Sequence, residues 1–233
     1  MIVLNFRCWI LWTALLLPTA AALSYFYFFS DPKWMIPLYS TSKFIQFSLP
    51  LFVLFFFSKE NFRWEPLGSN KFFLGNFIGI LFFVILLLTY WGLKDFSFVK
   101  EAALLIFEKL SALGVHRPLQ FFIFSIFISV FHAFLEEYYW RWYVYRELRR
   151  SLSALGASFF SSVAFTSHHV VVISAYIPES VWKWGIFVFP AYVFMAGFVW
   201  AFMYERTNSL ALVWISHIWA DIAIMGIAAM MVF

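Results

Sequence analysis

Adjacent glutamates in an otherwise apolar chain are the first side chains that could move a proton. Glu136 is followed by Glu137, and Arg141 comes one helical turn after the second of them. Spacing of four places Glu137 and Arg141 on one helix face, where they can form an ion pair. Glu136 points about 100° away, on the side where His132 lies one turn earlier. We therefore predict that Arg141 neutralises Glu137 and that Glu136 is free to act as a base.

Two later stretches supply histidines inside apolar runs. Phe165 opens one that ends in the adjacent pair His168 and His169. These two histidines point about 100° apart, so we expect only one of them to face a given site. In the other stretch Asp221 follows His217 by four residues, a spacing that stacks the two side chains on one helix face. Neutral imidazole is the cheapest ionisable side chain to bury, and it can act as a base, a donor or a metal ligand.

Each stretch also has a purely structural interpretation. The charges around Arg141 could anchor a helix end, a lone buried histidine is more often structural than catalytic, and the His–Asp pair could simply join two helices. If the three faces converge, they could instead deprotonate a water and stabilise the oxyanion formed on an amide carbonyl. Ligands for zinc are also available: Glu136, His132, His169 and His217. The His-Glu-x-x-His spacing of zinc peptidases is absent from the sequence.

The composition of the chain indicates the environment in which these residues lie. The 233 residues are 64 % hydrophobic and 12 % charged, against about 45–50 % and ~25 % in a soluble domain. Such a chain cannot hide its apolar surface from water, which excludes soluble, disordered and disulfide-stapled secreted classes. The single Cys8 cannot form an internal disulfide, and the net charge of +4 is spread along the chain, which does not suggest nucleic-acid binding. We expect a polytopic membrane protein.

The expected fold class is all-α: a membrane helix bundle of about seven spans plus one interfacial helix. The candidate spans are Cys8–Phe29, Trp34–Phe57, Phe72–Leu93, Leu119–Tyr139, Leu152–Ile173, Trp184–Tyr204 and Ser209–Phe233. The second contains Pro37 and Pro50, so it should be kinked or begin only near Phe44. Charged and apolar residues alternate through Lys94–Pro118 in the pattern of a helix lying on the membrane surface.

The N-terminal run and the basic residues bear on localisation. The first run resembles a signal peptide as far as Ala22, but its apolarity continues to Phe29, which favours an uncleaved first helix. With the N-terminus in the cytoplasm, the densest basic cluster, Arg146–Arg150, falls on the inner side, in agreement with the positive-inside tendency. We therefore expect an integral, multi-pass protein of the cell (inner) membrane with a cytoplasmic N-terminus.

The three motifs together resemble those of one family. Glu-Glu-x-x-x-Arg begins at Glu136, Phe-x-x-x-His ends at His169 and His-x-x-x-Asp ends at Asp221, in that order. They look like the motifs of the CPBP family of intramembrane endopeptidases, which includes CAAX-processing enzymes and bacteriocin-processing proteins. The segment Glu205–Leu210 is also similar to the Arg-Thr-x-Ser-Leu run of that family. The resemblance covers about residues 119–224 and is specific because three motifs occur in order.

The resemblance implies a role for each matching position. Glu136 and His169 would hold and activate the attacking water, His217 and Asp221 would form the oxyanion site, and Glu137 with Arg141 would be a supporting ion pair. The secondary candidates are His132, His168 and Phe165. In CAAX-processing relatives this chemistry is thought to run on glutamate, so no cofactor is expected. A weakly bound zinc, if one takes part, would use Glu136, His169 and His217.

The last motif position departs from the CAAX enzymes, which carry Asn where this chain has Asp221. An asparagine amide can donate to an oxyanion, whereas an ionised aspartate would repel it. We therefore expect Asp221 to orient the His217 ring through a hydrogen bond and His217 to donate to the oxyanion.

The function expected is that of an intramembrane endopeptidase acting on a membrane-associated protein or peptide. Residues 1–118 would form variable N-terminal spans with the interfacial segment, and residues 119–233 the catalytic bundle. The substrate class stays open among a prenylated C-terminus, a bacteriocin leader and a membrane-anchored tail, as does the oligomeric state. One alternative is a non-proteolytic immunity or regulatory protein on the same scaffold. Another is a proton-coupled transporter, against which the chain is short and shows no inverted repeat.

Overall fold

The computed structural model describes residues 2–57 and 65–233, and every regular element within these ranges is a helix. Seven helical stretches among the described residues are long and apolar enough to cross a membrane, as the apolar runs of the sequence predicted. The elements in chain order are α1 Ile2–Leu23, η1 Ser24–Phe28, α2 Pro32–Phe57, α3 Ser69–Leu93, α4 Ser97–Ala112, α5 Pro118–Ile126, η2 Phe127–His132, α6 Ala133–Glu137, η3 Tyr138–Tyr145, α7 Arg146–Arg149, α8 Ala154–Ser174, η4 Glu179–Val181, α9 Trp182–Thr207 and α10 Leu210–Val232. The fold is therefore an all-helical polytopic bundle.

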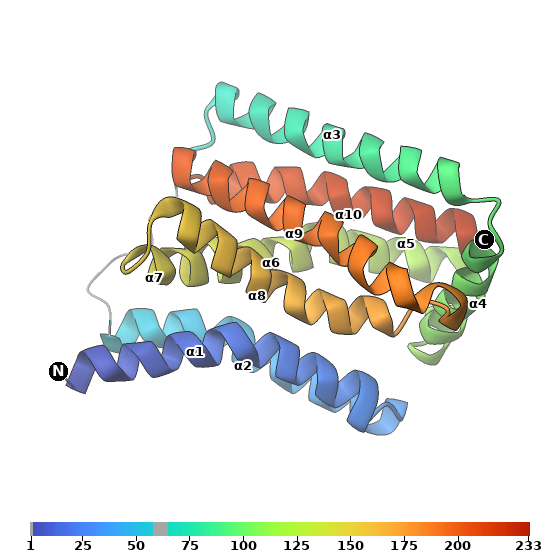
Figure 1. Cartoon of the computed structure of the whole chain (residues 1–233), viewed down its shortest axis with the longest axis horizontal. Helices are drawn as coiled ribbons and strands as arrows, with labels where there is room; N and C mark the ends of the chain where they lie inside the picture. The colour runs from blue at the N-terminus through green and yellow to red at the C-terminus, as the bar shows by residue number, and fades with distance from the viewer. Residues whose placement is uncertain (1, 58–64) are drawn as a thin grey trace.

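The helices run roughly side by side (Figure 1). The α1–α2 hairpin lies along one side of the bundle and α3 along the opposite side, with α8, α9, α10 and the α5–α7 span between them. α8 packs against both α1 and α9, while α3 packs against α10. The helix expected on the membrane surface is α4, which lies at the end of the bundle against α10. Its depth relative to the bilayer stays a prediction, as do the orientation and the uncleaved first span.

The second span agrees with its predicted range, Trp34–Phe57, but not with the alternative start that its prolines suggested. α2 runs from Pro32 to Phe57 with both Pro37 and Pro50 inside it, so the expected start near Phe44 was wrong. Each proline removes one backbone hydrogen bond. Membrane helices tolerate this loss because neighbouring groups and local adjustments satisfy the freed carbonyls. Pro50 is fully buried inside the protein, so other helices surround it.

The fourth span is longer than its hydropathy suggested. We expected it to end near Tyr139, but α5, η2, α6, η3 and α7 form one continuous helical stretch from Pro118 to Arg149. All eight residues of η3, a π-helical segment, are buried, and they include Trp140 and Arg141. Polar groups beyond Tyr139 do not end the span because they face the protein interior rather than the headgroups. π-helical turns of this kind are rare and occur often at functional sites.

α3 packs closely against α10 at two glycines that the sequence patterns did not mark. Gly75 and Gly79 are its only buried residues within the described structure, and they are spaced four apart as in the Gly-x-x-x-Gly packing motif. A Cβ atom on Gly75 would lie 2.8 Å from the Leu212 carbonyl oxygen. One on Gly79 would lie 2.6 Å from Cδ1 of Trp219. The absence of side chains therefore lets the two backbones approach closely.

Candidate active site

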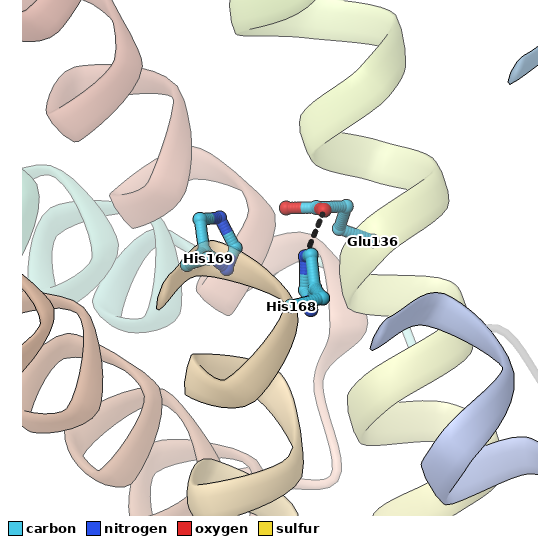
Figure 2. A group of neighbouring side chains, drawn as sticks. All are labelled: Glu136, His168 and His169. Atoms are coloured by element: carbon cyan, nitrogen blue, oxygen red, sulfur yellow. Dashed lines mark ion pairs between the residues drawn. The ribbon is translucent and has the colours of Figure 1, made fainter. Parts of the chain in front are cut away.

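The three polar stretches meet around Glu136, whose residue is only 2 % exposed. Its Oε1 lies 3.4 Å from His168 Nε2 and 3.9 Å from His132 Nε2. Its Oε2 lies 3.9 Å from His217 Nε2. One carboxylate at the end of α6 is thus approached by imidazoles from η2, α8 and α10. In Figure 2 the Glu136 carboxylate reaches from its helix toward the two histidines of α8.

His168 and His169 both face this carboxylate, contrary to the expectation that only one of them would. Each offers a ring nitrogen, and these atoms and a Glu136 oxygen all lie within 4.8 Å of one another. The two ring centroids are 4.1 Å apart. Glu136 comes from a neighbouring helix, and its carboxylate lies next to His168 with His169 close by (Figure 2). The angle between the two histidines on α8 therefore does not exclude either one from the site.

Separate contacts fix the two rings. The Nδ1 of His169 lies 2.9 Å from the Phe165 carbonyl oxygen, one turn earlier. Because a carbonyl oxygen only accepts, Nδ1 carries the hydrogen and Nε2 is left with its lone pair. The ring of His168 stacks on Trp140, with centroids 5.5 Å apart and planes 2° from parallel. His169 is therefore an acceptor oriented by the backbone of its own helix, and His168 is held by an aromatic side chain.

Glu137 connects Arg141 to His217 on the other side of the site. Arg141 Nε lies 3.2 Å from one Glu137 oxygen, so the ion pair expected from the spacing is present. The other oxygen lies 2.7 Å from His217 Nδ1, a contact between residues 80 positions apart. Glu137 and Arg141 are 0 % and 1 % exposed, and Arg141 also donates to the Gly197 carbonyl at 3.1 Å. Through these contacts Arg141 and Glu137 fix the position of the His217 imidazole on α10.

The expected role of Asp221 requires a correction. Asp221 Oδ1 lies 3.6 Å from His217 Nε2, which is longer than a hydrogen bond. Glu137 is the residue that hydrogen-bonds to the His217 ring, and it does so at the opposite nitrogen. Because the Glu137 carboxylate is an acceptor, the hydrogen of neutral His217 resides on Nδ1. Sequence spacing placed Asp221 on the correct face but could not show which nitrogen was already bound.

Trp200 and Gly197 also shape the site, although neither belongs to its motifs. Trp200 stacks on the His217 ring, with centroids 4.1 Å apart, and donates from its indole to Ser216 Oγ at 3.0 Å. The Arg141 guanidinium lies over the rings of Phe165 and Trp200, at 4.7 and 5.2 Å. A Cβ on Gly197 would lie 3.1 Å from the Phe165 ring. No pattern in the sequence marks Trp200 or Gly197, because both lie in α9, which carries none of the motifs.

The same cluster has the donor types of a metal site. Within the described residues, the set that could hold an ion is Glu136, His168 and His169, rather than the Glu136, His169 and His217 set anticipated for zinc. One carboxylate and two imidazoles suit zinc, and the bond from His169 Nδ1 to a carbonyl is the kind of support that metal-bound histidines commonly have. Zinc bound there would acidify a coordinated water.

Glu136 also has a carboxylate oxygen that can accept a hydrogen from a ligand. Its Oε1 is buried and has no hydrogen-bond partner among the described residues, although imidazoles surround it. Buried polar atoms are normally hydrogen-bonded, so an unpaired carboxylate oxygen is suited to accept a hydrogen from a small ligand such as water. The arrangement can therefore hold a water molecule between a carboxylate and an imidazole acceptor, beside a second imidazole fixed by Glu137.

Part of the chain matches a known protein family. Residues 118–223 match the family model described as type II CAAX prenyl endopeptidase, Rce1-like. The matched region contains all three motifs, which confirms the resemblance to CPBP-type intramembrane proteases found in the sequence. No curated protein and no solved structure matches the chain. The protein is thus a multi-pass membrane protein with a CAAX-protease-like region.

Proposed function

We propose that this protein is an intramembrane endopeptidase that hydrolyses a peptide bond of a membrane-associated protein or peptide with water activated by Glu136. The observation that carries the proposal is the division of labour between neighbouring glutamates. Glu137 is held closely by Arg141 and His217, at 3.2 and 2.7 Å. Around Glu136 the three imidazoles lie farther away, at 3.4 Å for His168 and 3.9 Å for His132 and His217. The longer contacts of Glu136 leave its Oε1 able to accept a hydrogen from a small ligand such as water.

In the proposed mechanism, a water donates one hydrogen to Glu136 and the other to His169 Nε2. Its oxygen lone pair then points toward the substrate carbonyl, and Glu136 removes a proton as the carbon–oxygen bond forms. The tetrahedral intermediate collapses by breaking the carbon–nitrogen bond, and protonated Glu136 returns the proton to the leaving amine. His169 thus orients the nucleophile, a role that its bond to the Phe165 carbonyl favours.

His217 would stabilise the oxyanion, provided that it carries a hydrogen on Nε2 as well as on Nδ1. That state is an imidazolium, whose positive charge Glu137 at Nδ1 and Asp221 near Nε2 would balance. Preorganised donors aimed at a developing negative charge are among the largest contributions to catalysis. In this scheme Asp221 acts as a counter-charge, and Glu137 is the group that orients the ring.

The test compares membrane proteomes of cells carrying the native protein and the Glu136→Gln variant. Glutamine keeps the size and loses the base, so we expect cleavage to fall by at least about a hundredfold. One or a few proteins should then accumulate in longer, uncleaved forms. Glu108→Gln, a change on the exposed face of α4, is the matched control and should leave every terminus unchanged. If no terminus changes in a folded Glu136→Gln protein, the scaffold acts by binding rather than hydrolysis.

We further propose that the water is activated without a resident metal, as the CAAX-type resemblance implies. Purified protein should then keep its cleavage rate after treatment with a chelator and dialysis. Loss of activity that zinc restores, together with one equivalent of zinc lost when His168 is replaced by alanine, would instead assign Glu136, His168 and His169 as metal ligands.

We place the protein in the cell (inner) membrane with a cytoplasmic N-terminus, which puts Arg146–Arg150 on the inner side. Its partners are then the bilayer and a membrane-associated substrate. In a protein whose Cys8 is replaced by serine, labelling of a cysteine introduced at Arg150, the exposed residue that follows α7, from either side of the membrane tests this orientation.

A further inference from the structure

A cavity of about 290 Å³ lies beside the candidate active site, between α2 and the α5–α7 span. Its walls include Tyr39, Lys43 and Phe47 of α2, and Phe127, His132 and Leu135 of the facing span. Most of these side chains are apolar or aromatic, which is typical of a ligand pocket that carries a few polar groups for orientation. The family match begins at residue 118, so it does not include the α2 wall.

One side chain, His132, separates the cavity from the candidate catalytic carboxylate of Glu136. His132 lines the cavity, and its Nε2 lies 3.9 Å from Glu136 Oε1. Leu135, the residue before Glu136, lines it as well. A ligand that filled the cavity would therefore end within one side chain of the proposed site of hydrolysis.

Lys43 is the unusual member of this lining. It lies well inside a membrane span, with its ammonium over the rings of Tyr39 and Phe47 at 5.8 and 5.5 Å. Ionisable residues within spans are costly, and they commonly mark substrate pathways. Within the described part of the chain, no carboxylate forms an ion pair with Lys43. An anionic group on a ligand would therefore bind favourably to the Lys43 ammonium, because charge-assisted hydrogen bonds are strong in an apolar cavity.

We propose that this cavity binds the part of a peptide substrate next to the cleaved bond, with a carboxylate of the peptide on Lys43 and an apolar side chain against Phe47 and Leu135. The carboxylate is either the C-terminus of the peptide or an acidic side chain. This inference rests on the proposed function, and it makes Lys43 a specificity-determining residue supplied by the N-terminal spans.

The test measures binding rather than cleavage, so it does not depend on activity. The Glu136→Gln protein is reconstituted in neutral lipid nanodiscs and titrated with dansyl-labelled four-residue peptides made of leucine and alanine. One peptide ends in a free carboxylate, a second ends in an amide, and a third is amidated but carries an internal glutamate. The first and third distinguish the two sources of the carboxylate, and the second carries none.

We expect at least one carboxylate peptide to bind about tenfold more tightly than the neutral one, because the difference is one charge-assisted contact. Adding Lys43→Gln should remove this preference, whereas Lys43→Arg should keep part of it. The matched control is Lys33→Gln on the same helix, where the lysine is exposed and lies over Trp34. An unchanged thermal transition would show that Lys43→Gln folds; if it does not fold, Lys43→Arg and the peptide series carry the comparison.

Three outcomes would overturn the inference. Two of them concern the Lys33→Gln control protein, which keeps Lys43: the carboxylate and amide peptides bind with equal affinity, or neither peptide binds. Alternatively, anionic phosphatidylglycerol could displace the carboxylate peptide, which would assign Lys43 to a lipid headgroup. Failure of the proposed function is distinguishable, because it would show as unchanged proteome termini while the carboxylate preference persisted in the binding assay.

Discussion

α3 and α8 are both membrane spans, but they use their residues in opposite ways. α3 is the most apolar of the seven candidate spans and the least buried inside the protein. Within the described structure its only buried residues are Gly75 and Gly79. α8 is less apolar, yet it buries eight residues, among them three serines and His168. Of these two spans, the more apolar one exposes most of its surface to lipid, and the less apolar one lies in the interior.

The comparison shows what stabilises each region. Lipid is as apolar as leucine, so burying the face of α3 against α10 gains little from hydrophobicity, and close approach at the glycines must supply the packing. Half of the buried residues of α8 are polar. Each of these polar groups needs its partner because water cannot replace it. We expect α8 and its neighbours to be sensitive to lost partners, and α3 to added volume.

The largest effect should come from breaking the buried ion pair on one side. Arg141→Gln removes the buried cation paired with Glu137 and leaves that carboxylate with its His217 contact alone. We expect this change to destabilise the fold by about 3–5 kcal/mol, as is usual when one partner of a buried ion pair is removed. The Glu137→Gln/Arg141→Gln double variant should recover much of this loss because no lone charge is left. Thermal unfolding in detergent, followed by tryptophan fluorescence, measures both. Arg149→Gln at the more exposed Arg149–Glu205 pair is the control, and it should lower the unfolding temperature far less, because ion pairs near the surface contribute little to stability.

A smaller effect should follow from adding volume to the buried face of α3. Gly79→Ala places a methyl group against Trp219 and the Ser216 backbone, at 2.6 and 3.0 Å. We expect a loss of about 1–3 kcal/mol, as for overpacked interiors, visible as a lower unfolding temperature. Gly92→Ala lies in the same helix with nothing within 4 Å, so it should leave that temperature unchanged. Equal effects of the two would refute close packing at Gly79.

Asp221→Asn should have a still smaller effect, seen in catalysis. Glu137 rather than Asp221 hydrogen-bonds to the His217 ring, so the variant loses only a counter-charge. We expect kcat/KM to fall by no more than about tenfold, equivalent to ~1.4 kcal/mol. The substrate identified with Glu136→Gln serves for the assay. A loss as large as that of Glu136→Gln would mean that Asp221 itself orients the ring during turnover.

The smallest effect should come from a lipid-facing side chain. Phe77 of α3 is 67 % exposed at the protein surface. We expect Phe77→Leu to change stability by no more than about 0.5 kcal/mol, because lipid accepts either side chain. The same substitution at Phe165, which is 2 % exposed among Trp140, His168 and Arg141, should reduce stability measurably more. Similar unfolding temperatures for the two would contradict the contrast between α3 and α8.

Hydropathy alone was sufficient to predict the seven spans, because a bilayer demands long apolar runs. It misplaced the end of the fourth span, since Arg141 is buried by protein rather than exposed at the headgroups. Local spacing predicted the Glu137–Arg141 pair, which depends on one helix only. It could not predict the bond from Glu137 to His217 or the joint approach of His168 and His169. Those contacts depend on how separate helices pack, which periodicity within each helix does not specify.

The stretch from Pro118 to Arg149 has a consequence for membrane thickness. As a regular α-helix its 32 residues would span about 48 Å, well beyond a hydrocarbon core of ~30 Å. η2 and η3 close hydrogen bonds over one more residue than an α-turn does, so they hold more chain in a given length. The remaining excess must be absorbed by tilt or by protrusion into the headgroups. Since Glu136 lies partway along this stretch, the depth at which substrate meets it should follow the acyl-chain length of the host lipid.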